Sequence, residues 1–205
     1  AEPREIIFTS CGTESNNAAI NSALQTQPGK RHVITTAVEH SANIKYGQML
    51  EKRGVEVTWI PVDRAGQLDV HEIHEAIRED TAMVSVMMAN NETGVVFPIE
   101  EIAAICRIKG VPFHTDAVQT PGKMELDVKA LGVDYLSLSA HKLHAPKGIG
   151  CLYVRQGLPY QSYIVGGGQE SGRRGGTENV AYMIAFGKAA EMATASLGGE
   201  VERIR

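Results

Sequence analysis

The sequence predicts a three-layer α/β fold in which a mainly parallel sheet of seven strands is covered by helices. Short apolar runs alternate with amphipathic stretches along all 205 residues, and this alternation is typical of strands joined by helical crossovers. Hydrophobic residues make up 43% and charged residues 21% of the chain, which is ordinary globular usage and is enough for a sizeable core. No linker or internal repeat divides the chain, so we expect one domain.

Seven apolar runs are expected to be strands, and five amphipathic stretches are expected to be helices. The strands are predicted at residues 5–9, 32–36, 56–60, 83–87, 111–114, 135–139 and 150–154. The helices are predicted at about 14–25, 41–52, 70–79, 99–109 and 177–196, each with apolar residues at three- and four-residue spacing. Parallel strands place the loops that bind ligands at the carboxyl edge of the sheet. The chemistry should therefore lie directly after strands.

Composition excludes several classes of protein. The formal net charge of −4 does not favour a nucleic-acid partner, and no run approaches the roughly 18 apolar residues of a membrane span. The three cysteines form no CxxC pair and no disulfide framework, which indicates a reducing cytoplasm. Because the chain starts without methionine and stops inside a helix-like stretch, we expect it to be a fragment. Residues 166–176 are so rich in glycine that we expect a long loop without a regular element.

A turn of small residues follows the first predicted strand and leads into a helix. The turn is Thr-Ser-Cys-Gly-Thr-Glu-Ser-Asn-Asn, residues 9–17. Backbone N–H groups and the positive end of the helix dipole meet at such a helix start, which suits a phosphate group. The alternative is an ordinary capping box with Ser10 or Thr13 as the cap. No Gly-Lys-Ser/Thr follows, so the turn is not a nucleotide-triphosphate loop.

Two further strand ends carry chemically useful side chains. Asp116 and Gln119 follow the fifth predicted strand, where an acid could also be a helix cap or a turn former. Lys142 directly follows the sixth strand. Burial lowers the pKa of a lysine amine and so prepares it to form a Schiff base. A phosphate site, an acid and a lysine together are what pyridoxal 5'-phosphate requires for its phosphate, its ring nitrogen and its aldehyde.

Six motifs make the chain similar to the cysteine desulfurases of the NifS/IscS type, in matching order and spacing over nearly the whole length. They are the turn at residues 9–17, Glu39-His40, Ala89-Asn90-Asn91-Glu92-Thr93-Gly94, His114-Thr115-Asp116-Ala117-Val118-Gln119, Ser139-Ala140-His141-Lys142 and Gly175-Gly176-Thr177-Glu178-Asn179. The resemblance implies fold-type I pyridoxal phosphate chemistry on a mainly parallel seven-stranded sheet. It also implies a homodimer whose active sites lie at the subunit interface. Residues 1–205 would be the cofactor-binding large domain, without the family's N-terminal segment and C-terminal small domain.

The same resemblance assigns a role to individual residues. Lys142 would be the Schiff-base lysine, Asp116 would keep the ring nitrogen protonated, and His40 would stack on the ring face. Gln119 would bind the phenolic oxygen, and Asn91 would bind that oxygen or the substrate carboxylate. The phosphate would be bound by Gly12, Thr13, Ser139 and His141, and by Thr177 from the partner subunit. Taken alone, His40 could cap a helix, Asn91 could form a turn before Gly94, and Thr177 could be an N-cap.

The implied activity is the removal of sulfur from L-cysteine, which yields L-alanine and an enzyme-bound persulfide for an iron–sulfur scaffold or another sulfur acceptor. Alternatives are a selenocysteine lyase, a class V aminotransferase or, for this fragment, a non-catalytic cofactor-binding or dimerisation domain. Cys11, Cys106 and Cys151 do not match the family's persulfide-forming position, so we expect this chain alone to be inactive. Cys106 and Cys151 should be buried apolar residues, and Cys11 should lie near the phosphate.

Two other motifs are interpreted as structural. His71 and His74 are three residues apart, whereas the HExxH zinc motif needs four, so a solvated helix face is expected. Arg173 and Arg174 could bind an anion, but we expect a structural or interface role for them.

Overall fold

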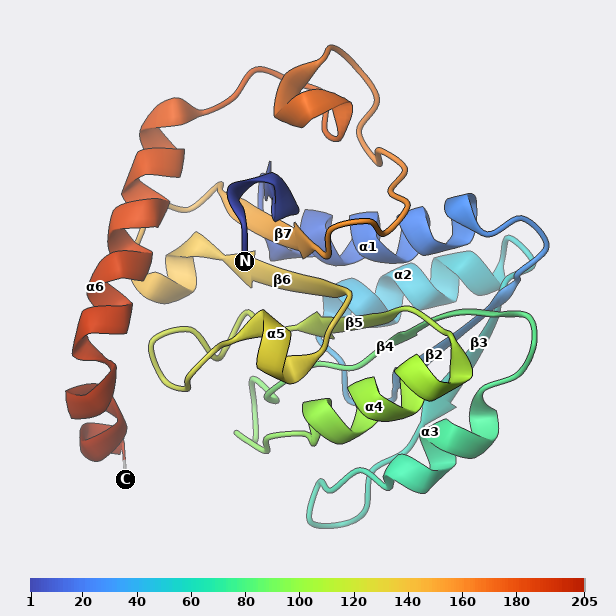
Figure 1. The fold of residues 1–205 in the computed structure, drawn as a ribbon. Helices are drawn as coiled ribbons and strands as arrows, with labels where there is room; N and C mark the ends of the chain where they lie inside the picture. Colours follow the sequence, from blue (N-terminus) through green and yellow to red (C-terminus); the bar gives the residue numbers. More distant parts are fainter. Residues whose placement is uncertain (205) are drawn as a thin grey trace.

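A computed structural model describes residues 1–204 of the chain, and these residues contain one seven-stranded sheet (Figure 1). Its strands, from one edge to the other, are β1 (Ile6–Thr9), β7 (Gly150–Val154), β6 (Tyr135–Ser139), β5 (Phe113–Asp116), β4 (Thr81–Ser85), β2 (His32–Thr36) and β3 (Glu56–Ile60). Only β7 is antiparallel to its neighbours within this sheet. The mainly parallel sheet predicted from the sequence is therefore confirmed.

Helices cover both faces of the sheet, which makes three layers (Figure 1). One face carries α1 (Gly12–Thr26) and α2 (Ser41–Glu51), and the other carries α3 (Val70–Ala76), α4 (Ile99–Lys109) and α5 (Val128–Leu131). Neighbouring residues of a strand point to opposite faces. Val33 accordingly packs with α1 and α2, whereas Ile34 packs with α3 and α4.

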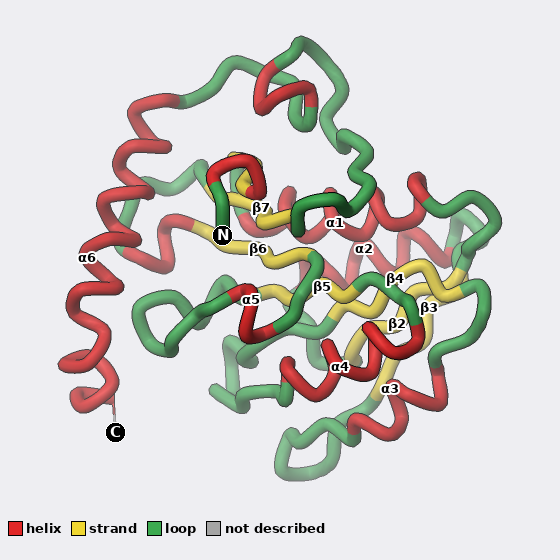
Figure 2. Tube along the Cα trace, in the orientation of Figure 1, coloured by secondary structure: helices red, strands yellow, loops and turns green. Residues whose placement is uncertain are grey.

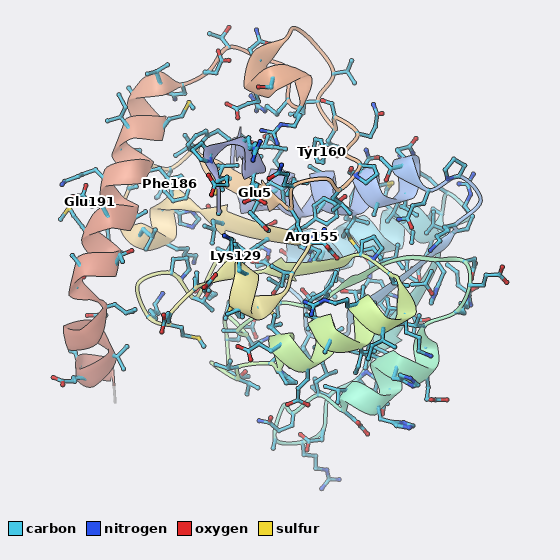
Figure 3. All side chains as sticks on the ribbon, in the orientation of Figure 1. Glu5, Lys129, Arg155, Tyr160, Phe186 and Glu191 are labelled. Carbon is cyan, nitrogen blue, oxygen red and sulfur yellow. The ribbon has the colours of Figure 1, made fainter. Side chains whose placement is uncertain are left out.

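The last helix, α6 (Val180–Ile204), lies beside the sheet and follows a long connection from β7 (Figure 2). Phe186 on this helix is buried against Leu143, Ile149 and Cys151, whereas Glu191 is exposed on the outer side (Figure 3). The structure also contains the 3-10 helices η1 (Pro3–Glu5), η2 (Ala140–Leu143) and η3 (Gln169–Gly172).

Two strands, β4 and β5, are shifted by two residues at both ends from their predicted ranges, and β1 starts one residue later than predicted. β4 starts at Thr81, two residues before the predicted apolar run, and the Thr81 hydroxyl lies 2.8 Å from Nδ1 of the buried His32. β5 starts at Phe113 rather than at residue 111, because Pro112 has no N–H to donate to the ladder. It ends at Asp116, a buried carboxylate inside the sheet.

The helix predictions needed three corrections. The helix predicted at 70–79 ends at Ala76, and α6 starts three residues later than predicted and continues through Gly198 and Gly199 to Ile204. The four-residue α5 was not predicted, because four residues are too few to show a helical period.

The glycine-rich segment, residues 166–176, is a loop as expected, because the four-residue η3 within it holds Glu170 and Ser171 at positive φ values that a regular helix does not have. It contains η3 and attaches to the outer edge of β1: the Phe8 N–H donates to Glu170 Oε2, and the Arg173 guanidinium donates to the carbonyls of Arg4 and Ile6. Arg174 forms an ion pair of 2.8 Å with Glu14 in the first turn of α1. Both arginines therefore have the structural role that the sequence favoured.

The other motifs set aside in the sequence lie on the surface. His71 is exposed and His74 half-buried on α3, where both lie near the exposed Glu75. Within residues 1–204 no three His, Cys, Asp or Glu side chains are grouped so that they could hold a metal ion. No helix in that range combines the length and the apolar character that crossing a membrane requires.

Candidate cofactor-binding site

A cavity of about 240 Å³ opens at the carboxyl edge of the parallel strands and collects the predicted site residues. Nine of the ten residues line it: Gly12, Thr13, His40, Asn91, Asp116, Gln119, Ser139, His141 and Lys142. Asp116 and Ser139 are the last residues of β5 and β6, and the others lie in the segments that follow β1, β2, β4, β5 and β6. The tenth, Thr177, lies outside this cavity and is exposed, in a second hollow that Ser10 and Arg174 also line.

The start of α1 forms one end of this cavity. Its N-cap is Cys11, and no side chain within residues 1–204 accepts a capping hydrogen bond there, so the predicted cap by Ser10 or Thr13 is absent. The Glu14 carboxylate, which the capping-box alternative would use, accepts from the Ser10 N–H at 2.8 Å and forms an ion pair with Arg174. The start of α1 therefore lies at the cavity without a side-chain hydrogen bond from its N-cap residue.

Gly12 lets the start of α1 pack closely against Val118 and Ser139, which line the cavity. A Cβ atom at this position would lie 2.8 Å from Cγ2 of Val118 and 3.5 Å from Cβ of Ser139. The first distance is shorter than real Cβ contacts, so only glycine fits without a shift of its neighbours. The missing side chain thus lets the first turn of α1 lie close to the loop after β5 and to Ser139, at the part of the cavity where a phosphate would bind.

Asp116 is a buried carboxylate, only 6% exposed. Its Oδ2 accepts from Nδ2 of Asn16 at 2.6 Å, and its Oδ1 accepts from the Val118 N–H at 3.0 Å. Burial raises the pKa of Asp116, and these hydrogen bonds oppose the shift. No lysine or arginine of the described range lies within ion-pair distance. A buried carboxylate of this kind favours a cationic N–H partner in the cavity.

Lys142 lies on η2, the 3-10 helix that directly follows β6, and is half-buried at the cavity. The preceding residues form a small polar network, in which Oγ of Ser139 lies 2.9 Å from Nδ1 of His141. Burial and the neighbouring Lys142 lower the pKa of His141. Because this hydrogen bond uses one of the two protons, either Nε2–H of the neutral His141 ring or the Ser139 hydroxyl remains free to donate to an anion.

His40 has both the local role that the sequence left open and a place in the cavity. Its Nδ1 accepts from the Ala42 N–H at 3.2 Å and so caps α2, while the same side chain lines the cavity. Asn91 is exposed at the cavity, and the adjacent turn is formed by Asn90, whose Oδ1 accepts from the N–H groups of Glu92 and Thr93. Thr177 is not the cap of α6, because the Tyr182 N–H donates to Oδ1 of Asn179 instead.

Glu39 supports the segment that carries His40. Its carboxylate accepts hydrogen bonds from the Thr36 hydroxyl, the Met87 N–H and Nδ2 of Asn43, at 2.9, 2.8 and 2.9 Å. Burial and the nearby charge of Asp116 raise the pKa of Glu39 to about 7. The end of β2, the first turn of α2 and the segment after β4 are thereby joined behind the cavity.

Sequence reasoning assigned no role to Cys11, Asn16, Met87 and Val118, which also line the cavity. Asn16 was detectable, because it lies four residues after Gly12 and therefore on the same face of the helix. Met87 and Val118 resemble ordinary core residues in the sequence. Cys11 is partly exposed, and Cys106 and Cys151 are buried, as expected.

The residues of the cavity fit pyridoxal phosphate. The uncapped start of α1, its close packing at Gly12, and a donor from Ser139 or His141 suit a phosphate. The buried Asp116 suits a protonated pyridine nitrogen, and Lys142 supplies an amine for the aldehyde. The open acceptor on the buried Asn16, whose Oδ1 has no partner among residues 1–204, is a further polar atom at this cavity.

The fold and this site define a member of the aminotransferase class-V family, and the chain belongs to that family, whose model matches residues 1–203. Among curated proteins it is 60% identical to cysteine desulfurase 2 of Trichormus variabilis over 193 residues, and 50% identical to cysteine desulfurase IscS of Dictyoglomus turgidum over 207 residues. These alignments cover 94% and 100% of this chain but 48% and 52% of the relatives. The chain therefore spans about half the length of these curated relatives.

Solved structures give the same result. A NifS-like protein superposes with a TM-score of 0.93 at 42% identity, covering 97% of this chain and 55% of that one. A structure of SspA in complex with cysteine superposes with a TM-score of 0.89 at 41% identity, covering 93% and 56%. Both likenesses support the fold-type I architecture that the sequence resemblance implied.

Proposed function

We propose that this chain is the pyridoxal phosphate-binding large domain of a cysteine desulfurase, which removes sulfur from L-cysteine and yields L-alanine. The observation that carries the proposal is the single cavity in which an uncapped helix start, a buried carboxylate and a lysine meet. The high identity to cysteine desulfurases over nearly the whole chain supports the same activity. The solved relative with bound cysteine supports cysteine as the substrate.

The nine predicted residues that line the cavity each have a task in this proposal. Gly12, Thr13, Ser139 and His141 bind the phosphate, and Asp116 holds a proton on the ring nitrogen. When bound, pyridoxal phosphate supplies an electron-withdrawing ring that stabilises negative charge at the substrate α-carbon. Lys142 would supply the amine that holds the cofactor aldehyde, and as a free amine it would move the α-proton of the substrate.

The remaining side chains of the cavity orient the ring and the substrate. His40 stacks on the ring face, where its capping bond to the Ala42 N–H fixes the imidazole. Gln119 binds the phenolic oxygen, and Asn91 binds that oxygen or the substrate carboxylate. The whole protein passes the sulfur to an iron–sulfur scaffold or another acceptor in the cytoplasm. The three free cysteines support this reducing location.

A homodimer is part of the proposal. Thr177 is exposed and lies outside its own chain's cavity, which supports a role at the partner's phosphate. Sedimentation should give a dimer, and Thr177→Ala should raise the dissociation constant of pyridoxal phosphate. A monomer with full cofactor affinity would contradict this part.

Covalent labelling tests the central assignment. The chain is incubated with pyridoxal phosphate, reduced with borohydride and mapped by peptide mass spectrometry. We expect the pyridoxyl group on Lys142, with Lys147→Ala as the control that keeps the label and Lys142→Ala as the variant that loses it. A label on Lys123 or Lys147 in the unsubstituted chain would show that the assignment is wrong. For the whole protein incubated with L-cysteine and a thiol reductant, which releases the sulfur of the enzyme persulfide as sulfide, sulfide and alanine should form in equal amounts.

A further inference from the structure

Asn16 lies between the start of α1, which the proposed function assigns to the phosphate, and Asp116, which it assigns to the ring nitrogen. It is on α1, one turn after Gly12, so the helix that offers its start to the phosphate also presents Asn16 to the cavity. Asn16 is 1% exposed, and its Nδ2 donates to Oδ2 of Asp116 at 2.6 Å. Among the described residues this amide is the only side chain that hydrogen-bonds Asp116, since the other donor is the Val118 backbone.

Two contacts fix the position of α1 relative to the end of β5. Gly12 faces Val118, and Asn16 faces Asp116. The Val118 N–H donates to one oxygen of the Asp116 carboxylate, and the Asn16 amide donates to the other. Rotation of the carboxylate would break both hydrogen bonds, so its orientation is set by the helix as well as by the strand.

The orientation of the amide also depends on the charge of Asp116. Two oxygen atoms at 2.6 Å repel each other unless a proton lies between them, so a donating Nδ2 matches an ionised carboxylate. Among the effects on Asp116, this hydrogen bond is the largest of those that lower the pKa and oppose burial. The other amide atom, Oδ1, is buried and has no partner within residues 1–204. Such an orphan acceptor costs free energy, which is consistent with a requirement for the donor on the other side.

We propose that Asn16 is a positioning residue of the cofactor site, whose side-chain amide holds the Asp116 carboxylate in the orientation that faces the ring nitrogen of pyridoxal phosphate. The inference rests on the proposed function, because it assumes that Asp116 receives that nitrogen. Without the amide, the carboxylate can turn away from the ring nitrogen, and its negative charge then stabilises the ring N–H less. The ring nitrogen then loses its proton at a lower pH.

The test uses two variants that share only the loss of the donor. Asn16→Leu keeps a branched side chain of similar shape, whereas Asn16→Ala leaves a void, so any common effect comes from the missing amide. Asn21→Leu, on the same helix but outside the cavity, is the matched control. Each protein is loaded with pyridoxal phosphate carrying 15N in the ring, and the 15N chemical shift is followed against pH, because it separates protonated from deprotonated pyridine.

In both Asn16 variants we expect the ring nitrogen to deprotonate about one pH unit or more below the unsubstituted chain. The dissociation constant of the cofactor should rise about tenfold, which corresponds to about 1.4 kcal/mol. Asn21→Leu should match the unsubstituted chain in both measurements. If one Asn16 variant does not fold, as judged by circular dichroism, the other carries the test.

Two failures can be distinguished. If borohydride does not place the cofactor on Lys142 of the unsubstituted chain, the proposed function fails. If Lys142 is labelled but both Asn16 variants show the 15N titration of the unsubstituted chain, Asn16 has no positioning role and this inference is overturned.

Discussion

His114 lies fully buried in the middle of β5 and is held by two hydroxyl groups. Its Nδ1 lies 2.8 Å from Oγ of Ser85, and its Nε2 lies 2.9 Å from Oγ of Ser137. Burial lowers the pKa of His114 to about 3, because no charged partner replaces the water that an imidazolium loses. The ring is therefore neutral in the folded chain at any physiological pH.

The neutral His114 predicts a loss of stability in acid. Between pH 6.5 and about 3 the unfolded chain binds a proton that the folded chain does not, so this contribution is fully present above pH 6.5 and is lost as the pH falls. The slope should approach about 1.4 kcal/mol per pH unit. Urea unfolding at pH 7 and pH 5 measures it, and His114→Gln should remove this part. The exposed His71→Gln, as the control, should keep the slope; equal slopes in all three chains would contradict the assignment.

Glu39 should shift stability with pH in the opposite sense. Its pKa is raised to about 7, so the folded chain keeps a proton that the unfolded chain releases from about pH 4.5. The stabilisation is present below pH 4.5 and is lost as the pH rises to 7. Glu39→Gln carries no such proton, and it can keep the network if the Asn43 amide turns its partnerless Oδ1 toward the new donor.

The measurement for Glu39 is the difference in unfolding free energy between Glu39→Gln and the unsubstituted chain. This difference should move in favour of the variant as the pH rises from 5 to 7.5. Glu92→Gln, at an exposed turn, is the control and should show no such trend. A difference that stays constant with pH would show that Glu39 is ionised throughout.

At the scale of elements, α1 connects the cavity to the rest of the sheet. Its first turn contacts the loop after β5 at Gly12, and its buried residues Ala19 and Ile20 pack in the core on that face. These contacts fix the distance between α1 and the strands on which it packs. A change at its first residue should move the phosphate site without disrupting the core.

Gly12→Ala tests this arrangement. The added Cβ would meet Cγ2 of Val118 at 2.8 Å, and such overpacking typically costs about 1–3 kcal/mol. Because the strain falls at the helix start, we expect the dissociation constant of pyridoxal phosphate to rise at least tenfold while far-ultraviolet circular dichroism stays unchanged. Gly187→Ala in α6, where nothing lies within 4 Å of the new Cβ, is the control and should leave cofactor binding unchanged. Equal affinity in the two variants would show that the close contact has no role.

For the whole molecule, the cavity joins segments that are far apart in the chain. Residues from five strand ends meet there, between Gly12 and Lys142. A ligand that binds only the folded chain stabilises it by an amount that grows with concentration, about 2.7 kcal/mol at one hundred times the dissociation constant. Pyridoxal phosphate should therefore raise the midpoint of thermal unfolding. Pyridoxal, which lacks the phosphate, should raise it less, and identical midpoints for the two would exclude a phosphate site at α1.

Much of the fold could be predicted from the sequence because the strands alternate with helices and end in polar residues. Lys142 and Asp116 were identifiable since each follows an apolar run at the sheet edge. The start of β5 was predicted too early, because the apolar run begins before Pro112, which has no N–H to donate to the ladder. Asn16 received no role because its partner is 100 residues away, and only the packing of α1 on β5 shows the contact. The contacts of the glycine-rich segment are equally long-range.

The attachment of that segment to β1 has a consequence for solubility. β1 is the last strand of the sheet, and an open strand edge can template pairing with another chain and lead to aggregation. Here the outward-facing Phe8 N–H and Ile6 carbonyl are occupied by Glu170 and Arg173, two charged side chains that leave no pattern for a further strand to continue. The glycine-rich segment, residues 166–176, therefore also hinders intermolecular β-pairing at this edge of the sheet.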